Sequence, residues 1–380
     1  MIQVSKPFMG AAELNEVGKV FQTGWLGMGS WVKEFEDKIC SYIQSKECIA
    51  VNTGTNALHL AFDILDFKAG DEVIVPSLTF IATIQSIIQA GGTPVFCDVE
   101  ESTLNLKITD LKQKITSKTK AIVPVHYRGL PCNMEELLSL ADKHGLVVVE
   151  DAAHAFGSSY HFSNGSIAKI GSFGHLTCFS FDPIKVITCG EGGAVCTNNH
   201  EWAERIRKKR ILGIDKDTWS RYKNERSWFY DVVERGYRHH MSNINAAIGC
   251  KQLEQIDNFI NRRQEICKKY DEKISDSFFN GRLELLHSDY NQMAVFTYIV
   301  RVLNDDRSKL MDYLKSKEVS TGINYIPCHT QSICKNYRSE NLITTNKIAN
   351  EILTLPLYFG LLDQEVDSVV KLIRNFYETN

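Results

Sequence analysis

The sequence predicts an α/β protein with a mostly parallel sheet and a smaller α+β domain at its C-terminal end. Through the first two thirds of the 380 residues, short apolar runs alternate with helix-like stretches, which is typical of βαβ units. Those runs are apolar throughout, as expected when helices cover both faces of a sheet. With 43% hydrophobic residues, the chain can bury the core of one large domain and a smaller one.

Five strands are expected in the first part of the chain, at residues 48–51, 72–76, 94–98, 121–125 and 146–151. Between them, the helical spacing of apolar residues predicts helices at residues 54–65, 79–90 and 133–144. Gly91 and Gly92 follow the second of these stretches and Gly145 follows the third. Glycine often ends a helix, so these positions are expected helix stops.

Beyond Leu176 the predicted elements become shorter and are separated by glycines. We expect strands at residues 176–181 and 194–197, and then a charged helix at residues 200–212. The basic run RIRKKR at residues 205–210 within that helix is interpreted as a solvated face. Residues 214–235 are aromatic and charged without a clear period, which predicts a long surface excursion.

The last third of the chain predicts the smaller domain. A long amphipathic helix is expected at residues 243–270, followed by a strand at 295–302, a helix at 306–317, a strand at 319–325 and a final helix. The domain boundary is predicted at 245/246, with a large domain of residues 1–245 and a small domain of residues 246–380.

The composition favours a soluble protein of the cytoplasm. The formal net charge is −3 and no basic stripe follows the chain, so neither a nucleic-acid nor a membrane partner is expected. Eleven cysteines are scattered without a CxxC pair, which argues against a disulfide framework and a zinc site and fits a reducing compartment. The first residues, MIQVSKPFMG, lack a basic stretch followed by an apolar run, so no signal peptide is expected, and no apolar segment is long enough to cross a bilayer.

Lys185 lies in the sequence SFDPIKVITCGEGG, after a predicted strand and a bend at Pro183. A lone lysine is usually a solvated charge. A strand end followed by a glycine-rich turn, however, places a side chain at the rim of a sheet, where ligands bind in open α/β folds. A lysine desolvated there has a lowered pKa and can form a Schiff base with an aldehyde cofactor.

Asp151 ends the apolar run of LVVVEDAAHA, so its carboxylate is expected at the carboxyl end of a strand. Two interpretations remain open from the residues alone. Asp151 can cap a following helix, or it can pair with a pyridinium nitrogen and keep that nitrogen protonated. His154 would lie one helical turn further on and could contact the same ring, although a lone histidine is more often a satisfied core residue.

Residues 52–56 (NTGTN) lie between a predicted strand and a predicted helix. Backbone N–H groups at a helix N-terminus, hydroxyl side chains and a glycine for close approach can form a phosphate cradle. Ser180, near Lys185, can add a hydroxyl, and Phe80 follows a strand end where it can stack on a ring. Each signal is weak alone, but together they indicate a site for pyridoxal phosphate (PLP).

With these motifs in place, the chain resembles the DegT/DnrJ/EryC1/StrS family of sugar aminotransferases over essentially its whole length. The family's landmarks occur in order: GWLGMGSWVKEFE (residues 24–36), NTGTNALHLA, GDEVIVPSLTFIAT, EDAAHAFGS, FSFDPIKVITCGEGG, GYRHHMSNINAAIG and LPLY (residues 355–358). The resemblance implies the aspartate-aminotransferase type of fold, fold type I of the PLP enzymes, for the large domain.

The resemblance also implies roles for individual residues. Lys185 matches the lysine that holds the cofactor as a Schiff base, Asp151 matches the partner of the ring nitrogen, and His154 matches a residue that lies against the ring. The other expected cofactor contacts are Phe80, stacked on the ring, and the phosphate-binding Thr55, Asn56 and Ser180. The expected substrate contacts are Trp25, His240, Tyr325 and His329.

Members of the family are typically dimers whose active sites take residues from both subunits. The segment GYRHHMSN matches the stretch that reaches the neighbour's cofactor, but it departs from the common pattern GYNxRM. Arg238 replaces the usual Asn, and His240 replaces the usual Arg. A cationic Arg238 would bind a phosphate more strongly than an amide does. Asn324 likewise stands where the family often has His.

The reaction implied by the resemblance moves an amino group from L-glutamate to a nucleotide-linked keto-sugar, through the pyridoxamine phosphate (PMP) form of the cofactor. The GEGG form of the turn at residues 190–193 favours the C4 keto group of a 4-keto-6-deoxyhexose, in the biosynthesis of lipopolysaccharide O-antigen or another surface glycan. The alternatives are a C3 aminotransferase, a transaminase of a non-nucleotide keto-sugar, a PLP-dependent sugar dehydratase and a non-catalytic regulator. Lys185 argues against a dehydratase, because the dehydratases carry histidine there, and a non-catalytic regulator would be expected to have lost Lys185 or Asp151.

Overall fold

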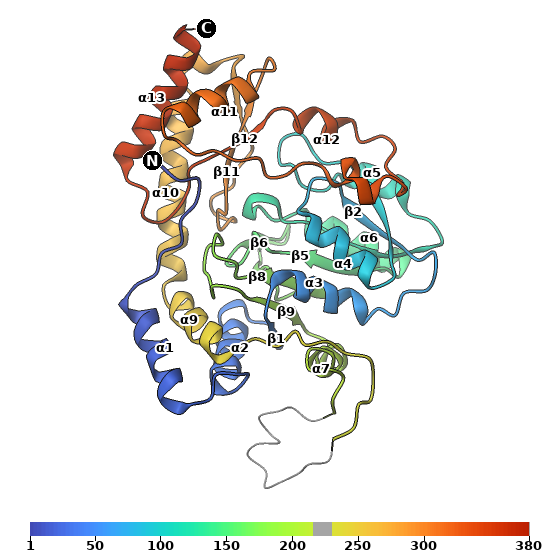
Figure 1. Cartoon of the computed structure of the whole chain (residues 1–380). Coiled ribbons are helices and arrows are strands. Elements are labelled where there is room, and N and C mark those ends of the chain that lie inside the picture. The colour runs from blue at the N-terminus through green and yellow to red at the C-terminus, as the bar shows by residue number, and fades with distance from the viewer. Residues whose placement is uncertain (216–229, 380) are drawn as a thin grey trace.

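A seven-stranded sheet forms the centre of the larger lobe in the computed structural model, which describes residues 1–215 and 230–379 (Figure 1). Its strands are β1 (Glu47–Val51), β2 (Glu72–Pro76), β3 (Thr93–Cys97), β4 (Thr119–Ile122), β5 (Val147–Asp151), β8 (Leu176–Ser180) and β9 (Gly193–Thr197). They lie in the order β1-β9-β8-β5-β4-β2-β3. Within the described residues, β9 runs opposite to the other six strands and the pairs without it are parallel, so the predicted mostly parallel sheet is confirmed.

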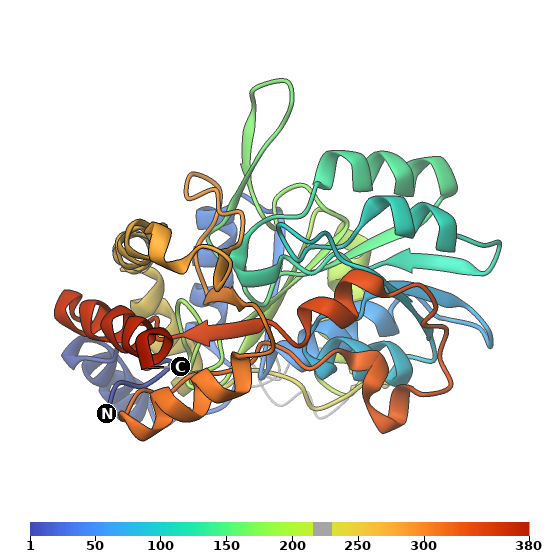
Figure 2. The ribbon, with the colours of Figure 1, turned by 90° about the horizontal axis from the view of Figure 1, so that it is seen from above.

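Helices cover both faces of this sheet, which explains why its strands are apolar throughout. In β1, Cys48 and Ala50 pack into the core on one face, while Ile49 and Val51 pack into the core on the other. The first face is covered by α2 (Ser30–Ile43), α5 (Ile108–Lys114), α6 (Met134–His144) and α9 (Asn243–Leu253). The second face is covered by α3 (Gly54–Asp63), α4 (Ile81–Gln89) and α7 (His200–Lys209), and Figure 2 shows α4 and α6 on opposite sides of the sheet.

A smaller lobe is built on a three-stranded antiparallel sheet of β10 (Leu283–Leu285), β11 (Tyr298–Val302) and β12 (Ile352–Leu355). Its helices are α10 (Ile256–Ile274), α11 (Arg307–Ser316) and α13 (Asp363–Thr379). The long helix α10 belongs to both lobes, because Phe259 and Ile260 pack in the larger core and Ile266 and Tyr270 pack in the smaller one (Figure 1). The domain boundary at 245/246 stays a prediction.

The remaining elements join or decorate the two lobes. They are α1 (Ala11–Thr23), which packs on α9, α12 (Ile343–Ile348), the hairpin of β6 (Ser159–His161) and β7 (Ile167–Lys169), and the short 3-10 helices Tyr127–Gly129, Ser277–Phe279, Cys328–Thr330 and Ser332–Cys334. The hairpin projects away from the body of the molecule (Figure 2). All eleven cysteines are free thiols. Across the part of the chain that the structure describes, no helix has both the length and the apolarity needed to span a membrane.

The single long helix predicted at residues 243–270 is wrong. The structure has two helices there, α9 and α10, because Gln255 leaves the helical conformation with φ −112° and ψ 5°. No proline or glycine marks this break, so the sequence pattern gave no signal for it. The break lets α9 pack on α1 and α2 while α10 runs on into the smaller lobe.

Two further expectations also need correction. The strand predicted at residues 319–325 is absent, because Val319 and Gly322 form only isolated bridges, with Ile2 and Thr354. The basic run at residues 205–210 is not a solvated face throughout, because Lys209 and Arg210 are buried in ion pairs with Asp63 and Glu36. Most of the surface excursion predicted at residues 214–235 lies outside the described residues.

Candidate active site

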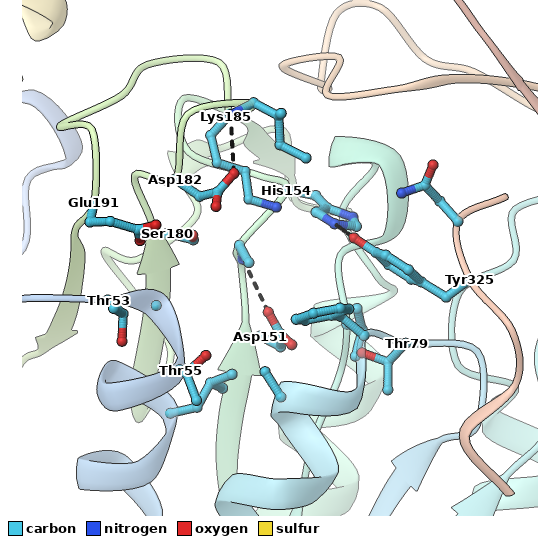
Figure 3. Close-up of a pocket in the computed structure, with 18 residues that line it drawn as sticks. Thr53, Thr55, Thr79, Asp151, His154, Ser180, Asp182, Lys185, Glu191 and Tyr325 are labelled. Carbon is cyan, nitrogen blue, oxygen red and sulfur yellow. Dashed lines mark hydrogen bonds between the residues drawn. The ribbon is translucent and has the colours of Figure 1, made fainter. Parts of the chain in front are cut away.

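A cavity of about 240 Å³ lies at the carboxyl end of the large sheet, where Asp151 ends β5 and Ser180 ends β8 (Figure 3). Neighbouring parallel strands end at the same edge of a sheet, which brings these two side chains to one pocket. The starts of α3 and α4 form one wall, and the loop after β8 forms another. Asn324 and Tyr325 close the pocket from the segment that precedes β12 in the chain.

Asp151 is 5% exposed, and both of its carboxylate oxygens accept hydrogen bonds. Thr83 Oγ1 donates to Oδ2 over 2.7 Å, and the backbone N–H of Ala153 donates to Oδ1 over 3.1 Å. Burial raises the pKa of Asp151, and these two hydrogen bonds act in the opposite direction. The helix-capping interpretation is wrong, since turns rather than a helix follow Asp151.

Lys185 reaches the same pocket from the loop after β8 (Figure 3). Its Nζ lies 4.1 Å from the centroid of the Phe296 ring. Burial lowers the pKa of Lys185 to about 8, although the charges of Asp182 and Asp151 act in the opposite direction. A lysine with this pKa has a larger fraction of uncharged, nucleophilic amine at neutral pH than an exposed lysine has.

His154 lies against the aromatic side of the pocket (Figure 3). Its ring stacks on Phe296 with centroids 4.2 Å apart, and its Nε2 lies 2.8 Å from the hydroxyl of Tyr325. Burial, with the charge of Lys185 as a smaller cause, holds the pKa of His154 well below its usual value. The imidazole is therefore neutral at physiological pH, and it does not lie one helical turn beyond Asp151 because no helix forms there.

The N-terminus of α3 forms a cradle on the other side of the pocket. The Thr53 hydroxyl caps the helix by accepting the Asn56 backbone N–H over 3.1 Å. The backbone N–H groups of Gly54 and Thr55 have no hydrogen-bond partner within the described residues. Ser180 faces this end from β8 (Figure 3). The approach is so close that a Cβ on Gly54 would lie 2.7 Å from the Ser180 Cβ. Two free amides with nearby hydroxyls at a helix N-terminus suit a phosphate group.

Seven of the residues singled out from the sequence line this pocket: Thr55, Phe80, Asp151, His154, Ser180, Tyr325 and Lys185. Asn56 does not line the pocket, and its amide Nδ2 instead donates a hydrogen bond to Asn52 Oδ1 over 2.7 Å. His329 also lies outside the pocket, with Nδ1 2.6 Å from Ser77 Oγ and Nε2 3.1 Å from Asn346 Oδ1. Both ring nitrogens of His329 are thus occupied, so the structure does not bring this residue to a substrate in the pocket.

Trp25, Arg238 and His240 line a second cavity of about 510 Å³, which is separate from the first within one chain. Three segments form it: residues 24–28, residues 211–214 and the GYRHH stretch at residues 236–240. The Trp25 indole donates to the Met28 carbonyl over 2.9 Å. These three expected contacts therefore share one surface but do not face Lys185 of their own chain.

Several pocket residues were missed in the sequence. Thr79 and Thr83 lie four residues apart in TFIAT, and that spacing would have placed both hydroxyls on one side of the helix predicted at residues 79–90. Asp182, shortly before Lys185 in the chain, also lines the pocket, as does Glu191 of the GEGG turn. Phe296, which supports both Lys185 and His154, comes from the smaller lobe and no local pattern pointed to it.

The residues present fit PLP. The pocket offers one lysine amine of lowered pKa, a buried carboxylate, an exposed aromatic ring at Phe80, and an anion cradle at the α3 N-terminus. Within the described residues, the buried Nδ1 of His154 has no hydrogen-bond partner, which leaves it available to a bound group. An aldehyde, a pyridine nitrogen and a phosphate are the chemical partners that this set of groups would satisfy.

Comparison with known proteins identifies the family of the chain. The model of the DegT/DnrJ/EryC1/StrS aminotransferase family matches residues 7–374. The spore coat polysaccharide biosynthesis protein SpsC of Bacillus subtilis is 35% identical over 379 residues, which cover 98% of this chain and 96% of SpsC.

Solved structures agree with the sequence comparison. The putative sugar aminotransferase Spr1654 of Streptococcus pneumoniae in its PMP-form superposes with a TM-score of 0.92 at 28% identity, covering 100% of both chains. Its PLP-form gives a TM-score of 0.90 at the same identity, over 100% of this chain and 99% of the other. Helicobacter pylori PseC, an aminotransferase involved in the biosynthesis of pseudoaminic acid, gives a TM-score of 0.92 at 25% identity over 100% of both chains.

Proposed function

The chain belongs to the DegT/DnrJ/EryC1/StrS aminotransferase family, and from that premise we propose that it transfers an amino group from L-glutamate to a nucleotide-linked keto-sugar. It is a PLP-dependent sugar aminotransferase with a large lobe of fold type I. The observation that carries the proposal is the placement of Lys185, with its lowered pKa, in one pocket with the buried Asp151.

The pocket residues divide the binding of PLP among them. Lys185 would join its amine to the aldehyde of PLP, and the Asp151 carboxylate would accept a hydrogen bond from the ring N–H. Phe80 would pack on the ring, while the free amides of Gly54 and Thr55 and the hydroxyl of Ser180 would bind the phosphate. When bound, PLP supplies an electron-withdrawing ring that lets an amino group move from one substrate to another.

Lys185 also moves the proton that the reaction requires. Its uncharged Nζ would act as the base that takes the proton from the amino donor's α-carbon. A general base works best when its pKa lies near the working pH, and the pKa of Lys185 at about 8 meets that condition. The neutral His154 leaves this amine without a second positive charge beside it.

The preferred position of amination is C4 of a 4-keto-6-deoxyhexose, with C3 as the alternative. The support is Glu191, the acidic residue of the GEGG turn, which lines the pocket together with Asp182 (Figure 3). Burial and the charge of Asp182 raise the pKa of Glu191. An aspartate at this position would be shorter by one methylene, so the length of this side chain can help select which keto carbon reaches Lys185.

The active unit is proposed to be a homodimer that shares its two active sites. Trp25, Arg238 and His240 line their own cavity, and a second copy seated there would bring them to the partner subunit's cofactor and substrate. Arg238 would then contribute a cation to the phosphates of the cofactor or the nucleotide. The eleven free thiols support a cytoplasmic location, and surface-glycan biosynthesis, O-antigen included, is the proposed setting.

A panel of keto-sugars tests the substrate proposal. The purified protein, supplied with PLP and L-glutamate, is incubated with 4-keto-6-deoxyhexoses on dTDP, UDP or GDP, with 3-keto isomers and with free keto-sugars. We expect 2-oxoglutarate release with a nucleotide-linked 4-keto-sugar and an amine at C4 by NMR, and no reaction by Lys185→Ala. An amine at C3 would overturn the position, and equal turnover of free sugars would overturn the nucleotide requirement.

A further inference from the structure

Thr83 occupies an unusual position behind the pocket, because one hydroxyl meets three oxygen atoms. Its Oγ1 lies 2.7 Å from Asp151 Oδ2, 3.1 Å from the Phe80 carbonyl oxygen and 2.9 Å from Thr79 Oγ1. Thr83 is fully buried, and Thr79 and Asp151 are nearly so, so water does not compete for these bonds. Thr79 and Asp151 both line the pocket (Figure 3).

The single proton of the Thr83 hydroxyl determines how this group can be satisfied. When Asp151 is ionised, its carboxylate and the Phe80 carbonyl are both pure acceptors, and Thr83 can donate to only one of them. The bond to Asp151 is the shorter one and is charge-assisted, so the proton points to Asp151. Thr79 then donates its own proton to Thr83 Oγ1.

The same arrangement also accepts a protonated Asp151. In that state the carboxyl donates from Oδ2 to Thr83 Oγ1, and the Thr83 hydroxyl turns to the Phe80 carbonyl. A rotation of the Thr83 hydroxyl exchanges the two patterns, and the Phe80 carbonyl keeps the backbone N–H of Thr83 as a donor over 3.1 Å in both. A valine in place of Thr83 would fill the same space but would leave Oδ2 without a protein hydroxyl in both states.

We propose that Thr83, supported by Thr79, is a positioning residue that orients the Asp151 carboxylate toward the cofactor's ring nitrogen and follows its change of protonation when PLP binds. The inference rests on the proposed role of Asp151 and deepens it. The hydroxyl acts on Asp151 rather than on the substrate. Its removal should therefore weaken the recognition of the ring nitrogen and leave recognition of the phosphate intact.

The test compares two ligands of the cofactor-free protein. One is PLP, and the other is an analogue of PLP in which a C–H group replaces the ring nitrogen. The dissociation constants of both are measured by titration for the wild type, Thr83→Val and Thr83→Ser. Ser86→Ala is the matched control, because Ser86 is an equally buried hydroxyl of α4 that donates instead to the Thr55 carbonyl over 3.2 Å.

The ratio of the dissociation constants for the analogue and for PLP measures how much the ring nitrogen contributes to binding. We expect the wild type to prefer PLP, and Thr83→Val to narrow this preference by about 10- to 100-fold, the range expected for a lost hydrogen bond to a charged group. Thr83→Ser should keep the wild-type ratio. Ser86→Ala should shift both constants alike, and Thr83→Ala serves in the same comparison if the valine variant does not fold.

Two results would overturn the proposal in distinguishable ways. If the wild type prefers PLP and Thr83→Val keeps the full preference, Thr83 has no positioning role although that of Asp151 stands. If the wild type binds the two ligands equally, the ring-nitrogen role of Asp151 fails, and the inference about Thr83 fails with it.

Discussion

At the scale of single residues, burial rather than residue type gives the site its chemistry. Lys185 and Asp151 are opposite charges in one pocket, yet burial shifts both toward their neutral forms. Their mutual attraction works against that shift in each case, and burial is the larger cause. A neutral amine and a carboxylate that gains a proton easily are suited to a cofactor that brings an aldehyde and a protonated ring nitrogen.

The lowered pKa of Lys185 predicts how the cofactor-free protein depends on pH. Because the folded-state pKa of about 8 lies below the usual 10.5, protonated Lys185 costs stability below pH 8, and this cost disappears as pH rises from 8 to 10.5. The same titration controls capture of PLP, since only the free amine reacts. The rate of PLP capture, followed by absorbance, should therefore rise with pH and level off above about 8. A midpoint near 10.5 would contradict this account, and Lys185→Ala supplies the control without the reactive amine.

The sequence predicted those site residues that directly follow a strand or begin a helix. Asp151 and Ser180 end strands, and Thr55 begins a helix, so the sheet itself brings them together. Phe296 and Thr83 were not predicted, because their importance depends on contacts between segments far apart in sequence. His329 shows the reverse, since the family resemblance predicted a substrate contact but Ser77 and Asn346 hold its ring outside the pocket.

At the scale of elements, the close approach of α3 to β8 builds the phosphate cradle. Gly54 allows this approach, because a Cβ there would lie 2.7 Å from the Ser180 Cβ and 3.2 Å from its Cα. The backbone Cα cannot turn away as a flexible side chain could, so a larger residue must push the helix off the strand. The position of α3 over the pocket thus requires a residue without a Cβ, glycine, at position 54.

Gly54→Ala should therefore weaken PLP binding. We expect a loss of stability of about 1–3 kcal/mol from overpacking, with lower affinity for both PLP and inorganic phosphate. Gly18→Ala is the matched control, because a Cβ at Gly18 in α1 meets no atom within 4 Å. Thermal unfolding and ligand titration measure the two effects. Unchanged affinity for both ligands in Gly54→Ala would show that the cradle does not hold the phosphate.

The strands and helices were predicted correctly where the pattern of apolar residues in the sequence alone determines them. Strands covered on both faces are apolar throughout, and all seven strands of the large sheet include residues predicted as strand. The break between α9 and α10 was missed, because packing against two separate cores bends the chain there and no helix-breaking residue does. The expected strand at residues 319–325 failed for a similar reason, since Val319 pairs with the distant N-terminal Ile2.

At the scale of the whole molecule, two cavities hold residues that the proposed reaction uses together. Lys185 lines one, and Arg238 lines the other within the same chain. A homodimer with two-fold symmetry would place the first cavity of each subunit beside the second cavity of its partner. Each complete site would then take Lys185 from one subunit and Arg238 from the other.

Mixing two impaired variants tests this arrangement. Lys185→Ala and Arg238→Ala are each expected to be strongly impaired alone. In a mixed dimer one site carries both substitutions and the other carries neither, so random exchange of subunits should restore about a quarter of the wild-type activity. The measurement is amino transfer after the two proteins are mixed and allowed to exchange. Activity no greater than the sum of the separate variants would contradict the shared site.

The visible absorption spectrum of the purified protein, before and after L-glutamate is added, tests the central claim most directly. That claim is that Lys185 binds PLP and that the enzyme with bound PLP takes an amino group from L-glutamate. We predict a visible band in the presence of PLP that gives way to the shorter-wavelength PMP spectrum as 2-oxoglutarate appears, and no such band in Lys185→Ala. A protein that stays colourless with added PLP, or a band that L-glutamate leaves unchanged, would contradict the account.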